Sequence, residues 1–176
     1  SWGNDTLYGG QGNDDLWASD EDDYAEGNAG DDNVNGGKGQ DELYGNEGDD
    51  TVAGGSGDDT AFGGSGDDMV KGDSGLKGDN GADGNDLLDG ESGDDTIKGE
   101  GGDDTIFGGS GEDQIFGGDG GDSIEAGAGD DHVDGGDGDD LIYGDAGASK
   151  PLYVFEAEDM DLAGGYQLED RSDTFS

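Results

Sequence analysis

A nine-residue unit repeats along most of this chain. Residues 54–62 read Gly-Gly-Ser-Gly-Asp-Asp-Thr-Ala-Phe, and residues 63–71 read Gly-Gly-Ser-Gly-Asp-Asp-Met-Val-Lys. The frame holds without a slip from Gly9 to Tyr143, and a partial unit stands before it. Self-similarity at a short fixed period predicts a solenoid, in which each unit forms the same small element and stacks on its neighbours.

The composition argues against an ordinary hydrophobic core. Hydrophobic residues make up 27% of the 176 residues, 43 residues are Gly, and the formal net charge is −43. A chain this polar and charged stays unfolded unless something neutralises it. The strict repeat nevertheless argues against a disordered linker, because disorder needs no register. Such acidity repels nucleic acid and anionic membranes, so we expect no nucleic-acid partner and no membrane insertion, and the partners must be cationic.

The residue types in the repeat point to calcium. Glycines allow tight turns with positive φ, in which backbone carbonyls can face one centre beside the carboxylate at the sixth place. Six to eight such oxygens suit Ca²⁺, whereas Mg²⁺ demands a more rigid octahedral shell. Zinc prefers Cys or His ligands, and the chain has no Cys and only His132. The candidate metal ligands are the aspartates at the sixth place: Asp5, Asp14, Asp23, Asp32, Asp41, Asp50, Asp59, Asp68, Asp86, Asp95, Asp104, Asp113, Asp122, Asp131 and Asp140.

The pattern Gly-Gly-x-Gly-x-Asp-x-(Leu/Ile/Val)-x resembles the nonapeptide repeat of RTX (repeats-in-toxin) proteins, a calcium-binding β-helix repeat. The resemblance implies an all-β fold over residues 1–147, a right-handed parallel β-roll of about eight coils with two nonapeptides per coil. Each six-residue loop would turn the chain, and each three-residue strand would cross it. Roughly ten to fourteen calcium ions would lie between loops of neighbouring coils. Aspartates 18 residues apart would share each ion, as in the pairs Asp50 with Asp68, Asp86 with Asp104, and Asp95 with Asp113.

The roll would stack the eighth-place residues in two ladders. One ladder would run through Leu16, Val34, Val52, Val70, Leu88, Ile106, Ile124 and Ile142, and the other through Leu7, Ala25, Leu43, Ala61, Asp79, Ile97, Ile115 and Val133. The seventh and ninth places would face outward and expose the aromatic side chains Tyr44, Phe62, Phe107, Phe116 and Tyr143, and His132 as well. So thin a core cannot offset the lost backbone entropy, so ion binding must supply folding free energy.

Two units depart from the pattern. Residues 72–80 keep the length but have Lys77 at the sixth place and Asp79 at the eighth. This departure predicts either a worn unit that bulges out with fewer ions beside it, or a private calcium site made by Asp73, Asp79 and Asp83. Residues 18–26 lack the loop glycines, so we expect their loop to be distorted.

Residues 148–176 lie beyond the repeats. They are expected to cap the open end of the roll, with residues 152–155 covering its last coil, or to begin a following module. Residues 155–160, with Gly164, Gly165 and Tyr166 after them, resemble the first strand of β-jelly-roll carbohydrate-binding modules. That resemblance implies that Glu156 and Glu158 help to hold a structural calcium ion.

No catalytic constellation is evident, because the carboxylates belong to the repeat and calcium-bound carboxylates cannot serve as general acids. We therefore expect no enzyme activity in this segment. The resemblance implies a monomeric segment of a longer, secreted bacterial protein, exported by type I secretion and folded by extracellular calcium. The alternatives are an accessory module of a secreted polysaccharide-acting enzyme (lyase or epimerase), with a polysaccharide or surface glycan as partner, and a segment of a surface-layer protein or adhesin.

Overall fold

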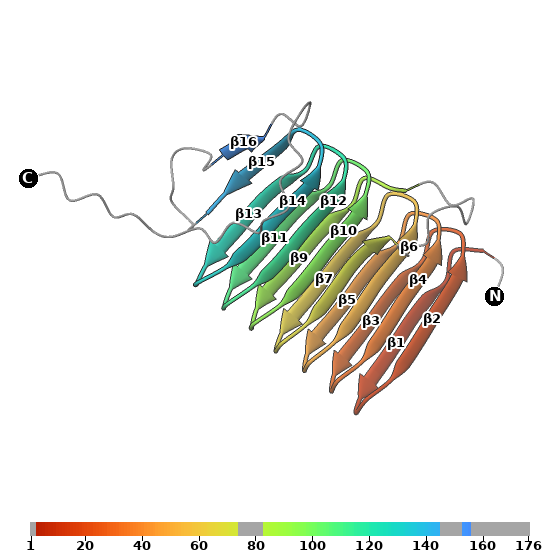
Figure 1. The fold of residues 1–176 in the computed structure, drawn as a ribbon. Helices are drawn as coiled ribbons and strands as arrows, with labels where there is room; N and C mark the ends of the chain where they lie inside the picture. Colours follow the sequence, from red (N-terminus) through yellow and green to blue (C-terminus); the bar gives the residue numbers. More distant parts are fainter. Residues whose placement is uncertain (1–2, 74–82, 145–152, 156–176) are drawn as a thin grey trace, which may run out of the picture.

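Two β-sheets face each other in a computed structural model that describes residues 3–73, 83–144 and the backbone of 153–155 (Figure 1). The odd sheet contains, in spatial order, β1 (Thr6–Gln11), β3 (Tyr24–Ala29), β5 (Glu42–Glu47), β7 (Thr60–Ser65), β9 (Leu87–Ser92), β11 (Thr105–Ser110), β13 (Ser123–Ala128), β15 (Asp140–Tyr143) and β16 (Tyr153–Phe155). The even sheet contains β2 (Asp15–Asp20), β4 (Asn33–Lys38), β6 (Thr51–Ser56), β8 (Met69–Asp73), β10 (Thr96–Gly101), β12 (Gln114–Asp119) and β14 (His132–Asp137). Within the described ranges no helix is long and apolar enough to cross a membrane.

The chain alternates between the two sheets and so winds a parallel β-solenoid. Consecutive strands along the chain lie in opposite sheets, and neighbours within a sheet pair in parallel, as Asn33 pairs with Thr51 one coil later. The predicted parallel β-roll with two nonapeptides per coil is therefore confirmed. It has about seven coils, since the even sheet has seven strands, rather than the predicted eight. The predicted right hand of the coil stays a prediction.

The strands are longer than predicted. Most span six residues instead of three, because the extended backbone continues through the first three places of the following unit. The register between neighbouring strands skips the first-place residues. Between β5 and β7, for example, Tyr44 pairs with Phe62 and the next pair is Asn46 with Gly64. The turn is thereby reduced to the fourth, fifth and sixth places. This shorter turn brings the sixth-place aspartate close to the sheet.

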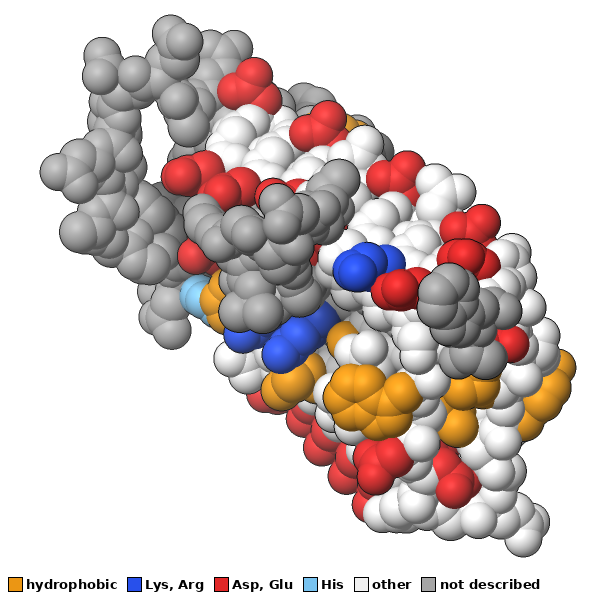
Figure 2. Space-filling model, turned by 90° about the vertical axis from the view of Figure 1, so that its right-hand side faces the viewer, with side chains coloured by type: hydrophobic (Ala, Val, Ile, Leu, Met, Phe, Trp, Pro, Cys, Tyr) orange, Lys and Arg blue, Asp and Glu red, His pale blue; other side chains and the backbone are white. Residues whose placement is uncertain are grey.

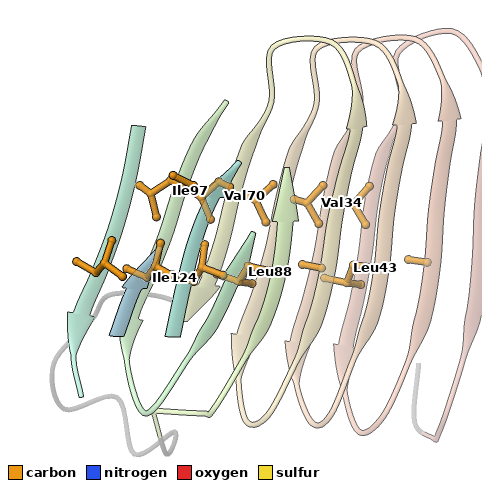
Figure 3. Close-up of a cluster of buried hydrophobic side chains, with 13 residues drawn as sticks. Val34, Leu43, Val70, Leu88, Ile97 and Ile124 are labelled. Atoms are coloured by element: carbon orange, nitrogen blue, oxygen red, sulfur yellow. The ribbon is translucent and has the colours of Figure 1, made fainter. Parts of the chain in front are cut away.

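The core consists of the eighth-place side chains, which point inward from both sheets, together with the first-place Ala126 (Figure 3). Val34, Val70 and Ile97 belong to the ladder of the even sheet, and Leu43, Leu88 and Ile124 to that of the odd sheet. The predicted ladders are wrong beyond Val70, because Val70 pairs with Ile97 and not with Leu88. Strand β7 pairs directly with β9, and β8 with β10, so the ladders continue from Ala61 to Leu88 and from Val70 to Ile97. Beyond this point, each eighth-place residue lies in the sheet opposite to the one that the sequence predicted for its ladder.

The outward faces differ from prediction in the packing of their aromatic side chains. Tyr44 and Phe62 are half-buried, because their rings stack with centroids 4.9 Å apart across neighbouring strands. Phe107, Phe116 and Tyr143 are half-buried as well, whereas the prediction that His132 is exposed is confirmed. The most exposed aromatic side chains are Tyr8 (63%) and Trp17 (64%), which lie in the first coil.

The last strand, β16, covers one edge of the odd sheet. It pairs antiparallel with β15, and Val154 lies opposite Leu141. The expectation that residues 152–155 cover the last coil stays a prediction, and residue 152 lies outside the described residues. Residues 156–160, Gly164, Gly165 and Tyr166, on which the jelly-roll resemblance rests, lie outside the described residues.

Candidate metal centre

Among the described turns between the sheets, every one except the turn at Gly84 places its fourth residue in the left-handed region. Gly48 has a φ of +131°, and a Cβ added there would collide with the Gly30 carbonyl of the preceding coil. The unit that lacks loop glycines follows the same path, since Ser19 and Glu21 have φ values of +105° and +83°. The predicted distortion of residues 18–26 is therefore wrong. The stacked turns on either side impose the common path on residues that disfavour it.

The sixth-place aspartates form two rows, one along each edge of the roll. From the second aspartate of each row onward, the carboxylate Oδ1 accepts a hydrogen bond of 2.6–3.1 Å from the backbone N–H of the sixth-place aspartate one coil earlier. Row 1, before the odd strands, is Asp5, Asp23, Asp41, Asp59, Asp86, Asp104, Asp122 and Asp140. Row 2, before the even strands, is Asp14, Asp32, Asp50, Asp68, Asp95, Asp113 and Asp131. All fifteen predicted ligands thus lie in these two rows.

In twelve of these aspartates the second carboxylate oxygen is buried and lacks a hydrogen bond. Within the described part of the chain, Oδ2 has no partner in Asp14, Asp23, Asp32, Asp41, Asp50, Asp59, Asp68, Asp86, Asp95, Asp104, Asp113 and Asp122. A buried carboxylate without a compensating charge is strongly unfavourable, so it either takes up a proton or binds a cation. Two rows of such oxygens are what a series of cation sites requires.

The first-place glycines bring a backbone carbonyl to the same position. A Cβ added at Gly9 would lie 2.8 Å from Asp14 Oδ2 and 2.7 Å from the carbonyl oxygen of Gly27 in the next coil. The same two kinds of oxygen surround the corresponding position of Gly54, Gly90, Gly99, Gly108 and Gly117. The absence of a side chain therefore leaves a space bordered by a carboxylate oxygen and a carbonyl oxygen from successive coils. Both are the hard ligands that Ca²⁺ takes.

Burial raises the pKa of several row carboxylates. The pKa rises to about 8 for Asp59 and Asp104 and to about 7 for Asp68 and Asp95. Loss of hydration is the largest cause, the hydrogen bond from the preceding coil lowers the pKa, and neighbouring aspartates raise it again. These four carboxylates therefore take up protons near neutral pH unless a cation displaces them.

No group of three or more His, Asp or Glu side chains in the described residues converges on one centre. That backbone carbonyls complete the cation sites in the turns stays a prediction. The predicted partners Asp50 and Asp68 are neighbours in row 2. The other two predicted pairs, Asp86 with Asp104 and Asp95 with Asp113, are also row neighbours.

The rows cross the irregular unit without a gap. Asp59 is followed by Asp86 in row 1, and Asp68 by Asp95 in row 2, each at a separation of 27 residues. Asp86 thus takes the position that Lys77 would have filled. Of the predicted private site, Asp79 lies outside the described residues.

The sequence analysis missed a second ladder at the fifth place. Its side chains are exposed and accept hydrogen bonds from backbone N–H groups one coil later, as Asp31 does from Asp49 and Asp49 from Asp67. This ladder runs in the opposite direction to the aspartate rows, where the acceptor lies one coil later than the donor. The frequent Asp or Asn at the fifth place was the available signal.

The sequence of the chain matches the model of a known family of repeats. The family model of the RTX calcium-binding nonapeptide repeat (4 copies) matches residues 3–25, 8–43, 17–52, 44–75, 80–115 and 116–149. The matched ranges contain every aspartate of both rows. A search of curated proteins found no match.

Proposed function

The chain belongs to the RTX calcium-binding nonapeptide repeat family, and on this premise we propose that it is an export-coupled folding module of a secreted bacterial protein. Its repeats bind calcium, and the β-roll is a structural module. Outside the cell, calcium would fold the chain into a rigid rod. Inside the cell, the same chain would stay unfolded and pass through a type I secretion channel.

The observation that supports this function is the burial of unpaired Oδ2 atoms along both rows. The formal charge of −43 opposes a compact state, and a divalent cation between neighbouring aspartates removes that repulsion. Row 1 has eight aspartates and so seven gaps, and row 2 has seven aspartates and six gaps. One ion in each gap would give thirteen, within the roughly ten to fourteen expected from the repeat.

The calcium concentration would decide where the chain folds. Extracellular calcium modules bind with dissociation constants of about 10⁻⁴–10⁻³ M, so such sites are empty in the cytosol and filled outside. The calcium sites would exist only in the folded chain. The free energy of calcium binding would therefore contribute directly to the free energy of folding. Folding would therefore begin as the chain emerges.

A calcium titration with two readouts tests this function. Circular dichroism follows strand formation, and equilibrium dialysis with metal analysis counts the bound ions. We expect little strand structure in EDTA and a cooperative transition in the submillimolar to millimolar range. Strand structure already complete in EDTA, or magnesium acting as well as calcium, would contradict the proposal.

A second candidate function is the docking of an acidic polysaccharide, as in an accessory module of a polysaccharide-acting enzyme. From β4 to β12, the outward seventh and ninth places of the even sheet carry no carboxylate: Asn33, Asn35, Thr51, Ala53, Met69, Lys71, Thr96, Lys98, Gln114 and Phe116. Lys71 and Lys98 are partners on neighbouring strands, and the Lys98 ammonium lies 5.8 Å from the Phe116 ring centre. Basic side chains lie among hydrophobic ones in Figure 2. Although the chain as a whole is acidic, this face has two lysines and no carboxylate at the outward seventh and ninth places. It is therefore suited to an anionic polymer.

Affinity electrophoresis in calcium, with a polyuronate and a neutral polysaccharide, tests this candidate. Lys71→Glu with Lys98→Glu should abolish retardation by the polyuronate. Lys38→Glu is the matched control, because Lys38 lies outside this face and pairs with Asp20 at 3.4 Å. Equal mobility of the wild type in both gels would exclude polyuronate docking.

A further inference from the structure

Asp73 is a buried carboxylate that the repeat does not account for. It stands at the second place of the irregular unit, at the end of β8, and is 4% exposed. Its register partner in β6 is Gly55, which has no side chain to contribute. The Gly84 N–H is shared between both carboxylate oxygens of Asp73, at 3.2 and 3.4 Å. The irregular unit therefore adds a negative charge to the interior of the roll.

Asp73 lies next to an element of row 1. The carbonyl oxygen of Gly72 lies 2.7 Å from the Cβ position of Gly54, and the unpaired Oδ2 of Asp59 lies at the same position. The nearby charge of Asp73 also raises the pKa of Asp59 and of Asp104. Asp59 is 2% exposed, so its Oδ2 cannot reach water. The Gly72 carbonyl and the Asp59 carboxylate thus border one position, and the buried Asp73 directly follows Gly72 in the chain.

We propose that Asp59, Asp73 and the Gly72 carbonyl form a cation site that holds calcium more tightly than the regular turns do. This inference rests on the proposed calcium-dependent folding and adds Asp73 as a ligand outside the sixth-place rows. Ligand charge is a main determinant of calcium affinity, and among the described residues Asp73 is the one buried acidic side chain outside the two rows. The site at the irregular unit therefore fills first.

Calcium binding measured by equilibrium dialysis of the whole chain tests this site. The wild type should bind a first ion at least about tenfold more tightly than the remaining ions. Asp73→Asn should remove this first phase and leave the later phase in place. Asp73→Gly should do the same, and it should fold, because glycine occupies the equivalent position in β6.

The matched control is Asp134→Asn, which removes the same charge from an exposed position on β14. It should keep the tight first phase. A wild type without a distinct first phase, or a first phase that survives in Asp73→Gly, overturns this site while leaving calcium-dependent folding intact. A wild type that binds no calcium would instead overturn the proposed function itself.

Discussion

The backbone N–H of Asp59 donates a 2.8 Å hydrogen bond to the carboxylate of Asp86, which follows it by 27 residues. Elsewhere in row 1 the same bond joins residues 18 apart, as from Asp41 to Asp59. One extra nonapeptide therefore enters the chain without entering the row. The roll accommodates this nonapeptide because its length equals one whole unit. Asp86 therefore takes the row position that follows Asp59.

Deletion of residues 74–82 should leave the fold intact. The joined sequence Gly72-Asp73-Asp83-Gly84-Asn85-Asp86 restores the turn pattern, and Gly84 already donates a hydrogen bond to Asp73. A shorter connection costs less closure entropy, so stability in saturating calcium should stay equal or rise by up to about 1 kcal/mol. Thermal unfolding followed by circular dichroism measures this. Deletion of residues 74–81 is the control, and it should be less stable because one residue too many remains in the turn.

Gly45→Ala should destabilise the calcium-bound roll by about 1–3 kcal/mol, because overpacking forces backbone shifts. The new Cβ would lie 2.6 Å from the Gly63 carbonyl oxygen and nearer still to Asp50 Oδ2. Gly121→Ala is the matched control, since its Cβ would meet no atom closer than 3.4 Å. Denaturant unfolding at fixed calcium compares the two variants. Equal stability would mean that the space beside the first-place glycine is not needed.

Asp50→Asn should lower the number of bound ions and weaken the calcium-bound state by about 1–3 kcal/mol. The amide can still accept the N–H of Asp32 through its oxygen, but it offers no charge to a cation. Asp49→Asn changes the exposed neighbour and should bind as many ions as the wild type. Metal analysis after dialysis distinguishes them. The same loss in both variants would assign the effect to net charge alone.

Acid should stabilise the calcium-free chain. The pKa of Asp59 and Asp104 rises from 3.8 to about 8 in the folded state, and that of Asp68 to about 7. A raised folded-state pKa contributes stability that is fully present below the unfolded pKa and is lost as pH rises through the folded value. In EDTA, strand content by circular dichroism should therefore be higher at pH 5 than at pH 8.

With calcium present the pH dependence should reverse, because protons compete with the cation for the same carboxylates. The calcium concentration at the folding midpoint should rise as pH falls from 8 to 5. A midpoint that does not change over this range would show that the buried carboxylates are not the ligands. As a control, sodium chloride holds the ionic strength constant, so that general screening of charges does not change along the titration.

Truncation after residue 147 should remove β16 and expose the edge of β15. The loss of this strand should lower the melting temperature in calcium and promote association through the open edge. Truncation after residue 158 retains Tyr153–Phe155 and should behave like the full chain. Thermal unfolding and sedimentation velocity compare the two. Identical behaviour would show that residues 148–158 do not cap the roll.

The sequence alone determined the fold class, the alternation of sheets and all fifteen aspartates of the rows, because a nine-residue period imposes the same environment on every copy. It could not locate Asp73 as an interior carboxylate, since nothing in the residues around it shows where the chain leaves the coil. It also gave no reason for Ser19 and Glu21 to follow the path of glycine, because that path is imposed by turns stacked on both sides.

Only the tertiary structure decided which strands meet across the irregular unit. The columns of Val70 and Leu88 are continuous along the chain, yet the two residues lie in opposite sheets. The physical reason is that a local period fixes each unit but not the partner on which it stacks. That partner is chosen by hydrogen bonds between coils, such as the bond from Asp68 to Asp95, which are satisfied when a whole unit is passed over.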